Sequence, residues 1–294
     1  MRMQRALVPE PRDESVRSIG RYGYHRIAYR DWGQPAAPVV FCVHGLSRNS
    51  RDFDPLARVL ANCRRVICPD IVGRGRSDWL ADPSDYHLIQ YNLDMTVLAA
   101  RIGTESFDWI GTSLGGLMGM ALAGIPNSPI RRLVINDIAP EVPTPALRRL
   151  SLYLGDDRRF PDLDALEAHL RVAFAPFGPM TDADWRRMAE TSSMATEEGY
   201  RLAYDPGIAQ NFRRYWLLIN ANLWRYWDRI TCPVLVLRGT ESDFLTTLLL
   251  DRMVRRLPHS EVIEFDGIGH TPTLNAPEQI EPIVRWLAST DQGA

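Results

Sequence analysis

The chain has 294 residues, of which 45% are hydrophobic and 24% charged, a composition typical of globular proteins rather than of disordered or disulfide-rich ones. Its 34 basic residues are all arginine and face 36 acidic residues, so the net charge of −2 leaves no basic excess for binding nucleic acid. The sequence contains no lysine, which excludes Schiff-base, pyridoxal phosphate and P-loop chemistry.

Membrane and metal-binding signals are also missing from the sequence. No apolar run reaches the ~18 residues of a membrane span, and no apolar signal core precedes Pro9. The four cysteines form no C-x-x-C pair, and the sequence has no H-E-x-x-H motif and no G-x-G-x-x-G after a strand. We therefore expect a cytoplasmic protein that uses no metal and no cofactor.

Short apolar runs alternate with helical patterns along the first half of the chain. Such runs predict strands that are buried on both faces, as in a parallel sheet covered by helices. The predicted strands are 38–43, 65–68, 107–111 and 132–136, and the predicted helices are 53–62, 88–102 and 114–124. The pattern resumes with strands at 233–238 and 261–265 and a helix at 277–288. This alternation indicates an α/β fold with right-handed crossovers.

One long segment interrupts the alternation. Residues 139–230 contain no convincing strand, but helical patterns recur at 144–154, 163–174, 182–194 and 210–227. The segment holds 13 of the 27 aromatic residues, including Tyr215, Trp216, Trp224, Tyr226 and Trp227. We interpret residues 139–230 as a helical cap inserted into a core made of residues 1–138 and 231–294.

A G-x-S-x-G motif, Gly111-Thr112-Ser113-Leu114-Gly115, stands between a predicted strand and a predicted helix. A tight strand-to-helix turn holds such a serine in a strained conformation, and the glycines allow the neighbouring backbone to approach. The serine hydroxyl is then exposed at the carboxyl end of the sheet. Ser113 is therefore the candidate nucleophile.

A serine nucleophile needs a base, and the base needs a carboxylate to orient it. Of the six histidines, His270 alone follows a late strand in a glycine-flanked loop, so it is the candidate base. The favoured carboxylate is Asp243, five residues beyond the strand 233–238, with Glu241 and Asp137 as alternatives.

The order serine, acid, histidine resembles that of the α/β-hydrolase superfamily. Further matching motifs are His44-Gly45-Leu46-Ser47, the run from Asp70 to Ser77, Ser242-Asp243 and Gly269-His270, so the resemblance covers nearly the whole chain. The chain looks most like bacterial esterase-like hydrolases that carry a helical lid. The resemblance implies an α/β-hydrolase fold with a mostly parallel eight-stranded sheet.

The resemblance also assigns roles. It implies an oxyanion hole made by the backbone N–H groups of Leu46 and Leu114, a loop-bracing role for His44 and a scaffold role for the loop from Asp70 to Ser77. A phosphate-binding role for the Gly-Arg-Gly stretch of that loop is a weaker alternative. Related dehalogenases and epoxide hydrolases place aspartate at the position of Ser113, so a serine there indicates acyl transfer.

We therefore expect a carboxylic-ester hydrolase whose small-molecule substrates have an apolar acyl or alcohol part, aliphatic polyester oligomers among them. Substrate-binding candidates are Arg48, Trp216 and Trp224. A carbon–carbon bond hydrolase of the meta-cleavage type, in which Arg48 and Asn49 would hold a dienoate carboxylate, is the alternative enzyme. A ligand receptor built on the same fold is the alternative outside enzymes.

Overall fold

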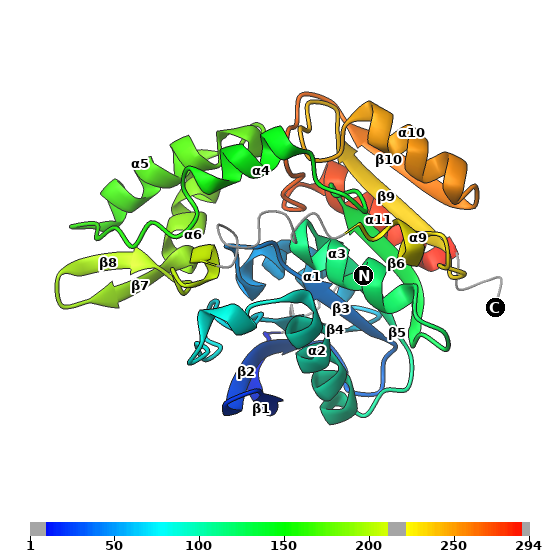
Figure 1. Ribbon diagram of the computed structural model, residues 1–294, viewed down its shortest axis with the longest axis horizontal. Helices are drawn as coiled ribbons and strands as arrows, with labels where there is room; N and C mark the ends of the chain where they lie inside the picture. The colour runs from blue at the N-terminus through cyan, green and yellow to red at the C-terminus, as the bar shows by residue number, and fades with distance from the viewer. Residues whose placement is uncertain (1–9, 211–221, 290–294) are drawn as a thin grey trace, which may run out of the picture.

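The computed structural model of the protein describes residues 10–210 and 222–289. At its centre is an eight-stranded sheet in the order β1-β2-β4-β3-β5-β6-β9-β10 (Figure 1). β1 and β2 are antiparallel, β2 is antiparallel to β4, and all other neighbours are parallel. The strands are β1 (Arg12–Gly20), β2 (Gly23–Trp32), β3 (Val39–Val43), β4 (Arg65–Pro69), β5 (Phe107–Thr112), β6 (Ile130–Asn136), β9 (Val234–Gly239) and β10 (Ser260–Phe265).

Helices cover both faces of this sheet because its central strands are apolar on both sides. In β3, Val40 and Cys42 pack in one hydrophobic cluster with α1 (Asp54–Leu60) and α11 (Pro277–Ser289). Phe41 and Val43 point to the other face, where they join the cluster that contains α2 (Leu88–Ile102), α3 (Leu114–Ala123) and α10 (Thr247–Arg256). The result is a three-layered α/β core whose parallel strands end at one edge.

The sequence predicted this fold class correctly. The six predicted strands correspond to β3, β4, β5, β6, β9 and β10, with ends that differ by at most two residues. β1, β2 and α10 were not predicted. β1 is largely exposed and reads Arg-Asp-Glu-Ser-Val-Arg-Ser-Ile-Gly, so it lacks the apolar run that marked the buried strands.

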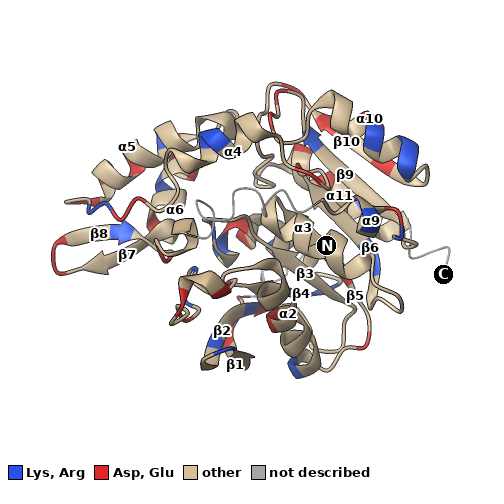
Figure 2. Ribbon diagram, viewed as in Figure 1, with Lys and Arg blue, Asp and Glu red and all other residues tan. Residues whose placement is uncertain are grey.

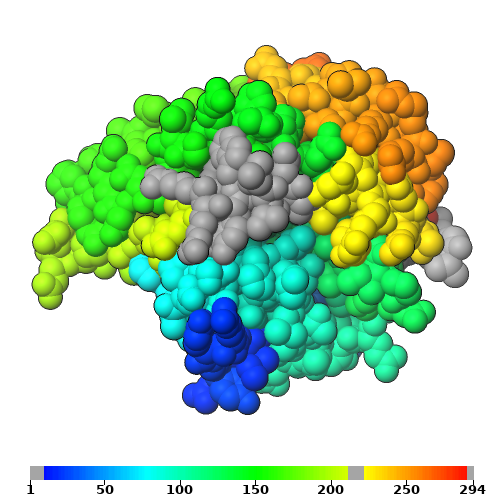
Figure 3. Space-filling view, viewed as in Figure 1, coloured from blue at the N-terminus to red at the C-terminus, as the bar shows by residue number. Residues whose placement is uncertain are grey.

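The segment between β6 and β9 lies outside the main sheet. It contains α4 (Thr144–Ser151), α5 (Leu163–Ala173), α6 (Asp182–Ser192), β7 (Ser193–Thr196), β8 (Gly199–Leu202) and α9 (Trp224–Trp227). Its part from α5 to β8 extends beyond the core, as Figures 1 and 3 show, whereas α4 and α9 pack against the core. Helices α5 and α6 pack in a cluster of their own, which includes Leu166, Leu170, Phe174 and Trp185. The segment therefore has a small hydrophobic core separate from those of the sheet.

The expectation that this segment contains no strand is wrong. β7 and β8 pair as an antiparallel hairpin directly after α6. Their residues are partly exposed on both faces, so the apolar alternation that identifies strands is absent. Of the predicted helix at 210–227, residues 211–221 lie outside the described part of the chain, and α9 forms its last turn.

Arginines and carboxylates are interspersed over the elements visible in Figure 2, which agrees with the balanced charge of the sequence. Among the described helices, none is both long enough and apolar enough to cross a membrane.

Candidate active site

Ser113 occupies the turn between β5 and α3. Its backbone angles, φ 51° and ψ −110°, lie in a region that L-residues rarely adopt. The turn is compact: a Cβ added to Gly115 would lie 2.0 Å from the carbonyl oxygen of Val43, and one added to Gly111 would lie 2.2 Å from the carbonyl oxygen of Gly115. The two glycines of the motif are therefore required because backbone segments approach where a side chain would stand.

His270 connects Ser113 to a buried carboxylate. Its Nε2 lies 3.0 Å from the Oγ of Ser113, and its Nδ1 lies 2.8 Å from Oδ2 of Asp137. Asp137 directly follows β6 and is fully buried. The other bonds to its carboxylate come from the backbone N–H of Gly239 at 3.0 Å and the hydroxyl of Ser242 at 2.6 Å. The bonds from Gly239 and Ser242 thus fix the orientation of the Asp137 carboxylate, which accepts a hydrogen bond from Nδ1 of His270.

This geometry corrects the expected acid. Asp243 does not contact His270; both of its carboxylate oxygens accept hydrogen bonds from Arg149 of α4 at 2.8 Å, and its side chain is 41% exposed. The physical reason is the position of Asp243 in the loop. β9 ends at Gly239, and Asp243 lies four residues further on, at a partly exposed position where its carboxylate meets Arg149 instead of His270. Asp137, which the sequence offered as an alternative, is one residue past β6, the strand that pairs with both β5 and β9.

The loop after β3 lies next to Ser113. A Cβ on Gly45 would be 3.7 Å from the Cβ of Ser113, so the backbone of this loop borders the hydroxyl. The N–H groups of Leu46 and Leu114 form no hydrogen bond with another described residue, and Leu114 opens a helix, where backbone N–H groups have no intrahelical acceptor. Both amides are thus available to an oxygen bound near Ser113.

Two buried side chains hold this loop in place. The N–H of Ile71 donates to Nε2 of His44, so the neutral imidazole carries its proton on Nδ1 and donates to the carbonyl oxygen of Gly45 at 2.7 Å. Burial lowers the pKa of His44 to about 4, which favours this neutral form. Arg74 is fully buried and donates from Nε to the carbonyl oxygen of Leu46 at 2.8 Å. The sequence did not single out Arg74 as a support of the loop.

The loop from Asp70 to Ser77 is a scaffold in this structure, as expected. Asp70 accepts hydrogen bonds from the backbone N–H groups of Ser50 and Arg76. Arg74, at the centre of the Gly-Arg-Gly stretch, bonds to the chain's own carbonyl oxygens from inside the core, which gives the phosphate-binding alternative no support.

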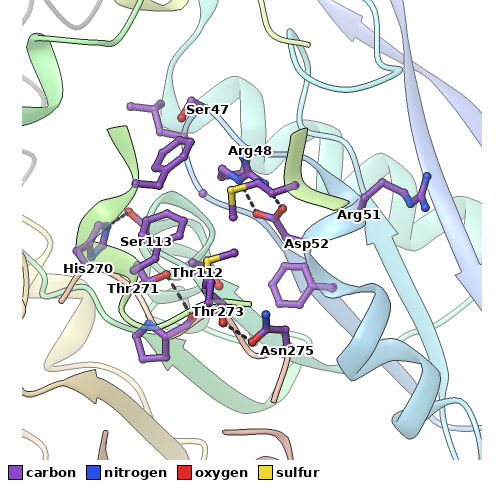
Figure 4. Close-up of a pocket in the computed structure, with 18 of the residues that line it drawn as sticks. Ser47, Arg48, Arg51, Asp52, Thr112, Ser113, His270, Thr271, Thr273 and Asn275 are labelled. Carbon is purple, nitrogen blue, oxygen red and sulfur yellow. Dashed lines mark hydrogen bonds and ion pairs between the residues drawn. The ribbon is translucent and has the colours of Figure 1, made fainter. Parts of the chain in front are cut away.

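A pocket of about 80 Å³ opens at Ser113 and His270 (Figure 4). Apolar and aromatic side chains from the core and from the segment between β6 and β9 form much of its wall: Phe53, Leu150, Tyr153, Phe174, Phe177, Met180, Met188 and Phe244. The charged residues of the wall are Arg48, Arg51, Asp52, Asp184 and Arg187. In Figure 4, His270 and Ser113 lie on one side of the view and Asp52 and Arg51 on the other.

The three substrate-binding candidates have different outcomes. Arg48 lines the pocket and is buried, with its guanidinium bonded to Asp52 and, at 2.8 Å, to the hydroxyl of Ser192 at the end of α6. Trp224 is not in the pocket wall; it is buried and donates its indole N–H to Glu141 at 2.6 Å, so this expectation is wrong. Trp216 lies outside the described residues.

The fold is that of an α/β hydrolase. The sequence model of the alpha/beta hydrolase family matches residues 39–282, and the chain belongs to this family. Among the described residues, no group of three or more histidine, cysteine, aspartate or glutamate side chains could hold a metal ion.

Known proteins resemble the chain over nearly its full length. It is 43% identical to the 3-hydroxybutyrate-oligomer hydrolase of Cupriavidus necator over 279 residues, which cover 92% of this chain and 95% of that protein. It is 27% identical to the 2-(acetamidomethylene)succinate hydrolase of Mesorhizobium japonicum over 246 residues, or 83% and 85% of the two chains. Among solved structures, an α/β hydrolase from Novosphingobium aromaticivorans has a TM-score of 0.83 and 36% identity, covering 94% of this chain and 98% of that one.

Proposed function

We propose that this protein is a serine hydrolase that cleaves the ester bonds of short hydroxy-acid oligomers, such as oligomers of 3-hydroxybutyrate, through an acyl-enzyme on Ser113. The observation that carries the proposal is the continuous hydrogen-bonded series from Ser113 through His270 to the buried Asp137. The choice of substrate draws on the 43% identical relative, whose name states activity on 3-hydroxybutyrate oligomers. The family alone would not supply it, because one fold supports many reactions.

In the proposed reaction, Oγ of Ser113 attacks the ester carbonyl carbon and its proton moves to Nε2 of His270. Asp137 keeps the Nδ1 proton in place and stabilises the imidazolium that forms. The tetrahedral intermediate collapses, and the alcohol leaves with the proton from His270. Water, activated by His270, then attacks the acyl-enzyme and releases the acid.

The N–H groups of Leu46 and Leu114 are proposed as the oxyanion hole. Leu114 directly follows Ser113, and the loop that carries Leu46 lies next to Ser113 and is held by His44 and Arg74. Such donors lie in position before the reaction, so they stabilise the developing charge without reorganisation. Loss of one donor of this kind costs a factor of roughly 10²–10³ in rate.

We further propose that residues 139–230 act as a cap that covers the site. Leu150, Phe174 and Met188 of this segment line the pocket together with Phe53 and Phe244. The pocket volume of about 80 Å³ is small beside the roughly 300–1,000 Å³ of pockets that hold drug-sized ligands. A short acyl unit such as hydroxybutyryl suits this space better than a long acyl chain.

The carbon–carbon hydrolase alternative lacks comparable support. It assigned a substrate carboxylate to Arg48 and Asn49. In the structure, Arg48 is bonded to Asp52 and Ser192, and the amide of Asn49 donates to the carbonyl oxygen of Thr191 at 2.8 Å. Both side chains therefore connect the loop after β3 to α6.

The test is turnover of the 3-hydroxybutyrate dimer and trimer, followed by chromatography of the monomer released, beside a vinylogous diketone substrate for carbon–carbon cleavage. We expect multiple turnovers of the oligomers, no cleavage of the diketone, and loss of activity in Ser113→Ala. Tight binding of the oligomers without multiple turnover would instead identify a receptor. Cleavage of the diketone alone would identify the carbon–carbon hydrolase.

A further inference from the structure

One face of α6 contributes four residues to the pocket wall. Asp184, Arg187, Met188 and Thr191 all line the pocket, and their spacing of three, four and seven residues places them on the same side of a helix. The C-terminal end of α6 is attached to the loop after β3 through Asn49. Arg187 lies one turn before Thr191 on the same helix. The attachment of α6 through Asn49 therefore also fixes the position of the Arg187 backbone at the pocket.

The three arginines of the pocket differ in how completely their charge is compensated. The guanidinium of Arg48 forms two bonds with Asp52, at 2.9 and 2.5 Å. Arg51 bonds to Asp54 at 2.6 Å. Each of these two arginines thus has a carboxylate at short range, and Arg51 shares the carboxylate of Asp54 with Arg30.

Arg187 has a weaker partner. The single hydrogen bond of its guanidinium to another described residue runs to Oδ1 of Asp184, at the long distance of 3.4 Å. The other oxygen of that carboxylate accepts from the hydroxyl and the N–H of Thr181, at 2.6 and 3.2 Å, in the capping box of α6. Arg187 lines the pocket, and its side chain is 35% exposed.

A hydroxy-acid oligomer has a free carboxylate at one end, and each cleavage leaves a product that carries it. The ester at Ser113 is uncharged, so recognition of this end needs a cation elsewhere in the pocket. A guanidinium fits a carboxylate well because its planar donors can form two parallel charged hydrogen bonds.

We propose that Arg187 binds the terminal carboxylate of the substrate and makes the enzyme select free-acid oligomers over neutral esters of the same length. This inference rests on the proposed function, since it names the substrate class of that site. Asp184 competes with the substrate for the same guanidinium. Its replacement by asparagine, which can still accept from Thr181, strengthens the subsite.

The test compares the free-acid dimer of 3-hydroxybutyrate with its methyl ester, which keeps the ester bond between the two units but has no charge. Only cleavage of that inter-unit bond is scored, because the methyl group adds a second ester bond. The readout is the ratio of kcat/KM for the acid to kcat/KM for the ester. We expect Arg187→Gln to lower this ratio about tenfold, mainly through KM for the acid. Arg187→Lys should recover part of it, and Asp184→Asn should raise it.

A matched control is Arg186→Gln on the same helix. Arg186 bonds to Asp164 at 2.5 Å and is not part of the pocket wall, so its loss should leave the ratio unchanged. If Arg187→Gln changed kcat/KM equally for the acid and the ester, the ratio would stay the same. That result would overturn the proposed subsite but not the proposed ester hydrolase activity. Failure of the unmodified enzyme to cleave either compound would overturn the proposed function and the subsite with it.

Discussion

The ring of Phe244 lies flat against the imidazole of His270, with the ring centroids 3.8 Å apart and the planes inclined by 14°. Asp137 holds the same imidazole at its Nδ1 edge. The edge contact fixes the direction of the ring and the stacked face restricts its rotation, so His270 is constrained in two ways. Phe244 directly follows Asp243, which Arg149 of α4 binds, and this ion pair connects the segment beyond β6 to the loop beside His270.

Replacement of Phe244 should therefore impair His270 without unfolding the protein. A stacked aromatic pair contributes about 0.5–1.5 kcal/mol beyond its buried area, so Phe244→Leu should lower kcat by roughly three- to tenfold. Phe244→Tyr keeps the ring and should retain most of the activity. Steady-state kinetics on a short activated ester provide the measurement, and an unchanged kcat in Phe244→Leu would show that the stack does not position the base.

Asp137→Asn and Asp243→Asn should have very different effects. An asparagine at position 137 cannot hold the Nδ1 proton as a carboxylate does, and the equivalent change in other triads costs about 10⁴ in kcat. Asp243→Asn removes a partly exposed ion pair, an interaction worth at most about 1 kcal/mol. We expect it to change kcat only a few-fold. The reverse ranking would return the role of the acid to Asp243.

Acyl chain length should report the size of the pocket. Each added methylene gains up to ~0.8 kcal/mol of burial until the space is full, so kcat/KM should rise from acetyl esters to an early optimum and then fall. Phe177 lines the pocket, and Phe177→Ala should move the optimum to longer chains. Trp224→Phe is the control, because Trp224 is buried away from the pocket and should not move it. A series that falls steadily from acetyl upward would show that this wall does not bind the acyl group.

His44 should make the stability of the fold depend on pH. Its pKa in the folded protein is about 4, below the ordinary value of ~6.5, so the unfolded chain binds a proton between these values that the folded chain does not. The contribution is complete above pH ~6.5 and is lost as the pH falls towards 4, with a slope of up to about 1.4 kcal/mol per pH unit.

Urea unfolding at pH 7 and pH 5 measures this effect. The loss of unfolding free energy between the two values should be smaller in His44→Gln, whose amide oxygen can still accept from Ile71, by up to about 2 kcal/mol. The same pH dependence in both proteins would mean that His44 titrates normally in the fold.

The parts of this fold that depend on local pattern could be predicted from the sequence. The buried strands and the turn at Ser113 belong to this group, because apolar runs and the spacing of Gly111 and Gly115 encode them directly. The position of His270 also followed from a local motif. β1 and β7 could not be found this way because β1 is largely exposed, β7 is partly exposed, and neither has alternating apolar residues.

The remaining features depend on contacts between distant segments. Asp137 and Asp243 both follow strands, and only the packing of the loop after β9 decides which carboxylate reaches His270. The tryptophan-rich stretch suggested a binding role by composition, yet Trp224 and Trp227 are buried near α3 and α10, while Phe174 and Phe177 line the pocket at Ser113. Aromatic content alone therefore did not distinguish the hydrophobic core from the binding site.

Labelling with an organophosphonate probe tests most directly whether Ser113, activated by His270 and Asp137, is the nucleophile. We predict that the probe modifies Ser113 alone, that hydrolysis of 3-hydroxybutyrate oligomers is lost in proportion to labelling, and that labelling is far slower in Asp137→Asn than in Asp243→Asn. Peptide mapping by mass spectrometry identifies the modified residue. Labelling at another residue, or full oligomer hydrolysis by Ser113→Ala, would contradict the account.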